Sequence, residues 1–225
     1  TKQQQTFLKS KNTSLARIKN SFPRPSKPLY QGRSEILVGV AMGLQKPATI
    51  AVIDAARNKT ILYRSVKQLL GKNYRLLNIL RKEKKIQSKR RHTAQKKDAH
   101  NKFGTSELGQ YIDYLFAKAI VELANAYQAG SIVIPKLGDI REIVQAEIQA
   151  LAETKIPGSL KGQSQYAKQY RVNIHQWSYG RLINNIKTKA NLVGIAIEEA
   201  KQPLRVSPQK QAEILAFEAY KSRNQ

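Results

Sequence analysis

The chain has 225 residues, of which 40 are Lys or Arg and 15 are Asp or Glu, and its formal charge of +25 predicts a polyanionic partner. A hydrophobic content of 41% excludes disorder throughout the chain and allows a substantial core. The lack of cysteine excludes disulfides, thiolate zinc sites and cysteine nucleophiles, and it indicates a reducing, intracellular location.

Residues 1–35 are polar and basic, and residues 22–28 contain three prolines. This composition disfavours a packed core and predicts an extended basic connector from a preceding lobe. Because Met42 is the only methionine, we expect the chain to be the C-terminal piece of a larger protein. We expect no membrane anchor, since no apolar run approaches the roughly 20 residues that span a bilayer.

Residues 36–225 are expected to form one α/β domain that opens with three short strands. Residues 36–43, 49–55 and 60–66 are rich in apolar and β-branched side chains, and short turn-forming stretches separate them. Connections this short allow only antiparallel hairpins.

The pattern then becomes helical and strongly basic over residues 67–102. Ser106 and Glu107 predict the start of a second helix, and Gly130 predicts its end. The expected apolar face of that helix recurs at three- and four-residue spacing: Leu108, Ile112, Leu115, Ala119, Leu123 and Ala126.

Alternating strands and helices follow to the end of the chain. We expect a buried strand at residues 131–134 that Pro135 closes, and then helices around 140–151 and 162–189. A fifth strand at 192–197 and a closing helix at 209–222 complete the pattern. This order predicts a mixed sheet with helices on its faces.

Carboxylates are too few for a metal site. Two-metal cleavage requires several acids around one point, because Mg²⁺ prefers oxygen ligands. No aspartate lies in the centre of the first or fourth strand, and Asp54 is expected to be a hairpin residue. We therefore predict no catalytic or metal-binding residue. The alternatives for Glu198, Glu199, Glu213 and Glu218 are a displaced metal site and solvated surface acids.

The clearest positive signal is the basic segment, which holds 14 Lys and Arg residues between Arg64 and Lys102 against Glu83 and Asp98. Charge of this density repels itself and predicts contact with nucleic acid. The cations lie all round the helix, which favours contact with two strands or a wrapped RNA. The candidate nucleic-acid-binding residues are Arg81, Lys82, Lys84, Lys85, Lys89, Arg90, Arg91, Lys96 and Lys97.

A second candidate region, residues 161–181, interleaves cations with aromatic residues and contributes Lys168, Arg171 and Arg181. Aromatic rings between cations can stack on bases while the cations neutralise phosphates. The alternative is that half of the tyrosines belong to the core, and we expect Trp177 inside. For His92 and His100, contact with phosphate and a solvated role both remain open.

Several segments carry a resemblance to a known family. They are ILVGVAMGL (36–44), FGTSELGQ (103–110), AGSIVIPKLGD (129–139), VNIHQWSYGRL (172–182) and KQPLRVSP (201–208). Together they resemble the RuvC-like, ribonuclease H-type domain of the type V-K CRISPR effectors that are associated with Tn7-like transposons. The resemblance covers essentially the whole chain.

In active relatives, acids occupy the positions that correspond to Ala41, Pro135 and the neighbourhood of Gln209 and Lys210. The resemblance therefore implies an RNA-guided, cleavage-deficient DNA-binding protein, without a cofactor, that marks a site for transposon insertion. Its implied partners are a crRNA–tracrRNA guide, PAM-containing target DNA, and an AAA+ transposition regulator with associated transposition proteins.

The same resemblance implies the cytoplasm of a prokaryote as the location. Two other functions compete with this one. The first is a metal-dependent RuvC-type nuclease that uses displaced carboxylates, and the second is a structural RNA-binding protein, which would share the positive charge.

Overall fold

The computed structural model describes residues 2–19, 30–44, 47–97, 107–174 and 178–223. Its strands are β1 (Arg33–Ala41), β2 (Thr49–Asp54), β3 (Lys59–Ser65), β4 (Ala129–Pro135) and β5 (Ala196–Ala200). They form one mixed sheet in the order β3-β2-β1-β4-β5. The predicted α/β class, with three antiparallel strands and two further strands, is confirmed.

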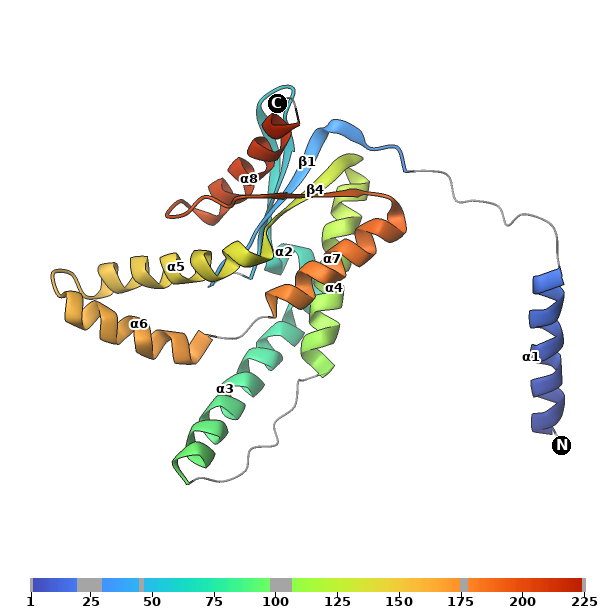
Figure 1. Ribbon diagram of the computed structural model, residues 1–225, viewed down its shortest axis with the longest axis horizontal. Coiled ribbons are helices and arrows are strands. Elements are labelled where there is room, and N and C mark those ends of the chain that lie inside the picture. Colours follow the sequence, from blue (N-terminus) through green and yellow to red (C-terminus); the bar gives the residue numbers. More distant parts are fainter. Residues whose placement is uncertain (1, 20–29, 45–46, 98–106, 175–177, 224–225) are drawn as a thin grey trace.

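Helices cover both faces of the sheet, and several extend away from it (Figure 1). They are α1 (Lys2–Lys19), α2 (Val66–Leu70), α3 (Tyr74–Lys96), α4 (Glu107–Ala126), α5 (Ile140–Lys155), α6 (Leu160–Ile174), α7 (Tyr179–Val193) and α8 (Pro208–Ser222). Short 3₁₀ turns, η1 (Gly71–Asn73) and η2 (Leu137–Asp139), precede α3 and α5. Among the described residues, no helix combines the length and apolarity that a bilayer-spanning segment needs.

The lengths of the connections explain the strand directions. Short turns join β1 to β2 and β2 to β3, and both pairs are antiparallel. β4 follows α2, α3 and α4, and this long crossover allows it to lie parallel to β1. β5 follows α5, α6 and α7 and is parallel to β4.

Alternate residues of β1 supply two separate cores. Ile36, Val38 and Val40 pack toward α4 and α7, whereas Leu37 and Ala41 pack toward α8. Both sets are buried, because helices cover both faces of the sheet at this strand. The nearly continuous apolar run of the first strand follows from this double burial.

The packing of α8 depends on Gly39 at the centre of β1. A Cβ atom at this position would overlap the backbone carbonyl oxygen of Ala212 and would lie 3.0 Å from the Cβ of Ala216. The helix backbone therefore rests directly on the strand, and any side chain at position 39 would push α8 outward.

We expect Gly39→Ala to destabilise the fold by about 1–3 kcal/mol, because overpacking at a rigid contact forces the backbone to shift. Urea unfolding followed by circular dichroism measures this loss. Gly138→Ala is the matched control, since a Cβ there would meet no atom within 4 Å. Equal stability of the two variants would contradict the close contact between β1 and α8.

The expectation of an extended connector is wrong for residues 2–19, which are helical. Lys2–Lys19 form α1, since this stretch is rich in helix-favouring Lys, Gln, Leu and Ala and contains neither Gly nor Pro. α1 lies apart from the other elements, and Phe7 and Leu8 on it are exposed (Figure 1). The prolines of residues 23–28 lie outside the described residues.

The apolar face predicted for the second helix is confirmed in part, since Leu108, Leu115 and Leu123 lie half-buried against the larger core. Of the predicted face only Ile112 is buried, and Gly130 lies inside β4 rather than ending the helix. The centre of the buried face is shifted because α4 packs against α7 on one side and the sheet on the other, and the spacing of apolar residues does not show where these neighbours lie. The buried residues of α4 are Gly109, Ile112, Asp113, Phe116, Ala117, Ile120, Val121 and Ala124.

The single helix predicted at residues 162–189 is also wrong. The structure has α6 and α7 there, and they have different neighbours: α6 packs against α5, and α7 packs against α4. Gly194 then ends α7 in the left-handed conformation, with φ of 91°, so the fifth strand starts at Ala196 instead of Leu192.

Candidate nucleic-acid interface

The long basic helix α3 is anchored at its start and extends away from the sheet afterwards (Figure 1). Leu77 and Leu80 are buried in the larger core, whereas the side chain of Ile86, two turns later, is 51% exposed. The part of α3 from residue 81 to residue 96 is called the outer part of α3 below. Its position leaves the side chains of Lys82, Lys89 and Arg90 exposed to a partner.

α3 contains nine Lys or Arg residues and one acid, Glu83. Among the described residues, none of Arg81, Lys82, Lys89 and Arg90 forms an ion pair. Lys97, directly after the helix, is exposed as well. Such a surface attracts polyanions by releasing their condensed counterions.

The remaining candidates on α3 are of two kinds. Lys84 is half-buried and acts electrostatically on Asp113 of α4, so part of its charge serves the fold. The side chains of Lys85, Arg91 and Lys96 lie outside the described part of the molecule. His92 and His100 fall there too, so both interpretations of these histidines remain predictions.

The described residues of the second candidate region do not lie on one surface. Lys168 is exposed on α6, which packs against α5 and is separate from α3 (Figure 1). Tyr166 and Tyr170 stack with ring centroids 5.6 Å apart and pack on the α5–α6 contact, so they serve the fold in part. The Arg171 side chain and Trp177 lie outside the described residues.

Arg181 does not belong to an open cationic surface. Its Nε atom lies 2.6 Å from Oδ2 of Asp113, whose side chain is only 2% exposed. Burial raises the pKa of Asp113, and the opposing effects of Arg181 and Lys84 do not cancel that rise. The ion pair joins α7 to α4, and we therefore leave Arg181 out of the interface.

The positions predicted to lack catalytic acids lie at one edge of the sheet. Ala41 and Pro135 end the adjacent parallel strands β1 and β4, and both are buried. Gln209 and Lys210 form the first turn of α8, which packs on β1. Lys210 is exposed and forms an ion pair with Glu213 at 2.6 Å.

Two buried amides occupy this edge. The Gln202 side chain accepts the backbone N–H of Met42 at 2.8 Å and donates to the Met42 carbonyl at 2.8 Å. Its nitrogen also lies 3.2 Å from Oε1 of Gln211, and both glutamines are at least 97% buried. Neutral amides thus hold the chain just after β1.

One carboxylate does reach this edge. Glu147 on α5 accepts the backbone N–H of Leu44 at 2.6 Å, and the Tyr179 hydroxyl donates to the Gly43 carbonyl at 2.8 Å. Burial raises the pKa of Glu147, while the Leu44 N–H lowers it in part. A single acid with one oxygen already engaged does not make a two-metal site.

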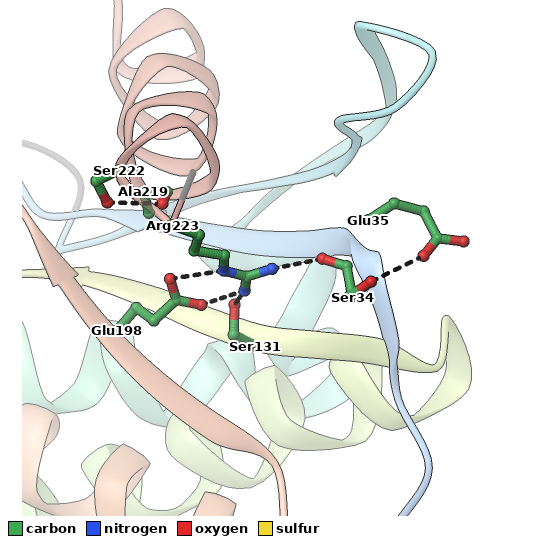
Figure 2. Close-up of polar contacts among 7 residues, drawn as sticks. All are labelled: Ser34, Glu35, Ser131, Glu198, Ala219, Ser222 and Arg223. Carbon is green, nitrogen blue, oxygen red and sulfur yellow. Dashed lines mark hydrogen bonds and ion pairs between the residues drawn. The ribbon is translucent and has the colours of Figure 1, made fainter. Parts of the chain in front are cut away.

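Glu198 is held in an ion pair by Arg223 at the end of α8. Figure 2 shows the Arg223 guanidinium between Glu198 of β5, Ser131 of β4 and Ser34 of β1. Arg223 Nε lies 3.0 Å from Glu198 Oε2. Burial would raise the pKa of Glu198, but the Arg223 hydrogen bonds outweigh it and the pKa is lowered. This network fastens α8 to three strands.

The other candidate acids are held separately. Glu199 pairs with Lys187 at 2.7 Å, and Glu213 accepts the Tyr63 hydroxyl at 2.5 Å in addition to Lys210. Asp54 accepts the backbone N–H of Arg57 in the β2–β3 turn, as predicted for a hairpin residue. Within the ranges that the structure describes, no group of His, Asp and Glu is arranged to hold a metal ion.

The sequence pattern did not single out Gln202 or Glu147, and it placed Tyr179 only in the second candidate region, with no role at this edge of the sheet. Gln202 lies 160 residues from its partner Met42, so no local spacing connects them. Asp113 gave one usable signal: it is an acid on the helix face that also carries Ile112 and Phe116, where a buried charge needs a partner.

Comparisons with known proteins add little at the sequence level, since no family model and no curated protein matches the chain. Among solved structures, it is similar to one titled "Cryo-EM structure of the Cas12f1-sgRNA-target DNA complex". The TM-score is 0.47 and the sequence identity is 17%. The alignment covers 80% of this chain and 31% of that one, so this chain spans less than a third of that length.

Proposed function

We propose that this chain binds nucleic acid as part of an RNA-guided DNA-binding protein and does not cut it. The observation that carries the proposal is the outer part of α3, where Arg81, Lys82, Lys89 and Arg90 project without an ion-pair partner among the described residues. Charge of this density repels itself, and a polyanionic partner would neutralise it.

The lack of cleavage is supported by the edge of the sheet where β1 and β4 end. Ala41 and Pro135 provide no oxygen ligand, and the amides of Gln202 and Gln211 bond to backbone or to each other. Among the described residues, Glu147 is the carboxylate that reaches this edge, and one acid is too few for a two-metal site.

The finer proposal follows the sequence resemblance. Residues 36–225 are a RuvC-like, ribonuclease H-type domain of a type V-K effector, and residues 1–35 connect it to a preceding lobe. Guide–target pairing reads the sequence, and the basic surface holds the duplex backbone. The partners are a crRNA–tracrRNA guide, PAM-containing DNA, and an AAA+ regulator with associated transposition proteins.

One experiment tests both parts of the proposal. The protein is incubated with a target duplex, with and without guide RNA, in Mg²⁺ or Mn²⁺, while retention and nicking are followed in the same tube. We expect guide-dependent retention and no nicking. RNA affinity without guide-dependent retention would indicate a structural RNA-binding protein. Nicking that disappears on mutation of Glu198, Glu199 or Glu213 would indicate a nuclease.

Restoring one acid should not restore cleavage. We expect Ala41→Asp to leave the duplex intact, because Pro135, Gln209 and Lys210 still supply no carboxylate. Position 41 is 2% exposed and packs under α8, so the variant will also lose stability. Ala41→Asn is the matched control for size without charge. Robust nicking by Ala41→Asp alone would contradict the proposal.

A further inference from the structure

A cavity of about 450 Å³ lies at the edge where β1 ends, between that strand, α5 and the start of α8. Its volume falls within the range of about 300–1,000 Å³ that is typical of small-ligand pockets. Small side chains create the space, since Ala41, Gly43, Ala146 and Ala150 all line it.

Thr49 contributes to the wall of this cavity without offering it a hydrogen-bonding group. It lines the cavity opposite Ala41 in the β1–β2 pairing, and its side chain is 95% buried. Among the described residues, its Oγ1 is buried without a hydrogen-bond partner. This oxygen has almost no accessible surface, so it faces the packed interior and a group in the cavity does not reach it.

Three further polar side chains line the cavity: Gln211, which lies beside the Gln202 amide, and two side chains of opposite charge, Glu147 and Arg205. Glu147 uses Oε2 to accept the Leu44 N–H, whereas Oε1 has no hydrogen-bond partner within the described ranges. Arg205 keeps 67% of its side chain exposed and only approaches Glu153, at 3.9 Å. The cavity thus offers an acceptor for N–H groups and a solvent-side cation.

The rest of the lining is largely apolar and includes Met42, Leu151, Val206 and Pro208. Flat aromatic ligands suit such walls, and their polar edges then meet the few placed polar groups. Carboxylates recognise bases by accepting from exocyclic amines, as Glu and Asp do for cytosine. Thymine and uracil lack such an amine.

We propose that this cavity is a pocket for one unstacked nucleobase that bears an exocyclic amine. The amine donates to Glu147, and Arg205 meets the attached phosphate. The inference rests on the proposed function, because a single strand held by the outer part of α3 would supply the base. A free nucleotide offers the same chemistry from another source.

The test uses 2-aminopurine, which bears the amine and changes its emission when its surroundings change. One arm titrates a single-stranded thymidine oligonucleotide that contains one 2-aminopurine, with overall binding followed by the anisotropy of a terminal dye. The second arm titrates free 2-aminopurine nucleoside monophosphate. Three variants are compared: Ala150→Leu fills the cavity, Glu147→Gln removes the carboxylate, and Ala126→Leu is a matched control on the exposed end of α4.

We expect a saturable emission change in at least one arm, retained in Ala126→Leu and lost in Ala150→Leu. Glu147→Gln should weaken probe binding roughly 10- to 100-fold, since it removes a hydrogen bond to a charged group. Thermal melting checks that both α5 variants fold. The arm that responds identifies the source of the base.

An unchanged emission in both arms would overturn the pocket, as would an equal response from Ala150→Leu. Anisotropy separates this failure from that of the proposed function. If anisotropy shows that the strand binds but the 2-aminopurine emission does not change, the proposed function is retained and the pocket is rejected. If the free nucleotide binds but the oligonucleotide shows no binding by anisotropy, the pocket is supported and the role of α3 in holding a strand is contradicted.

Discussion

Reversing four cations of the outer part of α3 is expected to lower nucleic-acid affinity by roughly 100-fold or more at low salt. A protein that neutralises fewer phosphates releases fewer counterions. The slope of log affinity against log salt should therefore fall by about 0.9 for each duplex phosphate that is no longer neutralised. The preference among sequences should stay unchanged, because phosphate contacts carry no sequence information. The variant combines Arg81→Glu, Lys82→Glu, Lys89→Glu and Arg90→Glu.

The measurement is a salt titration of duplex and guide-RNA binding. A matched control changes the net charge equally at exposed lysines away from α3, through Lys9→Glu, Lys59→Glu, Lys155→Glu and Lys221→Glu. This control should lose far less affinity and keep most of the salt slope. An unchanged slope in the α3 variant, or an equal change in the control, would place the contact elsewhere on the molecule.

Arg181→Met is expected to destabilise the fold by about 3 kcal/mol at neutral pH, without a direct effect on nucleic-acid contacts. Methionine keeps the length of the side chain but leaves the buried Asp113 carboxylate without its 2.6 Å partner. Removing one member of a buried ion pair strands an uncompensated charge, which costs more than the pair itself contributed.

The pH dependence of this variant distinguishes charge from packing. Burial already raises the pKa of Asp113, and removing Arg181 should raise it further. When the folded state raises the pKa of a carboxyl, the folded protein loses stability as the pH rises through that pKa. The stability difference between Arg181→Met and the wild type should therefore shrink as the pH falls. Denaturant unfolding at several pH values measures this trend.

The double variant Asp113→Asn with Arg181→Met is the control, since a neutral amide removes the stranded charge. It should recover part of the lost stability at neutral pH. A deficit in Arg181→Met that stays constant with pH would show that only packing was lost. Wild-type stability in that variant would contradict the pairing of α4 with α7 through this contact.

Local pattern was enough for most of the elements. Three apolar runs separated by short turns could form only hairpins, and β1, β2 and β3 pair in that way. The strand that Pro135 closes, the helix after Asp139 and the closing helix also lie where the sequence predicted them. These features depend on residues only a few positions apart, so the spacing of apolar residues along the sequence is enough to predict them.

Local pattern was not enough where partners are distant. The buried face of α4 depends on α7, which packs closely enough to bury Gly109 and Ala117. The break between α6 and α7 likewise depends on the different helices that they pack against. Spacing favoured one continuous helix, although the β-rich residues 170–174 in its middle argued against it.

The candidate site likewise has features that the sequence predicts and features that only the tertiary structure shows. The sequence by itself determined the charge of α3 and the absence of acids at Ala41 and Pro135, because composition and residue identity do not depend on folding. Only the tertiary structure decided that Arg181 is used by Asp113 and that Gln202 holds Met42. Such contacts join residues 68 and 160 positions apart, and only the packed sheet and helices bring these side chains within bonding distance.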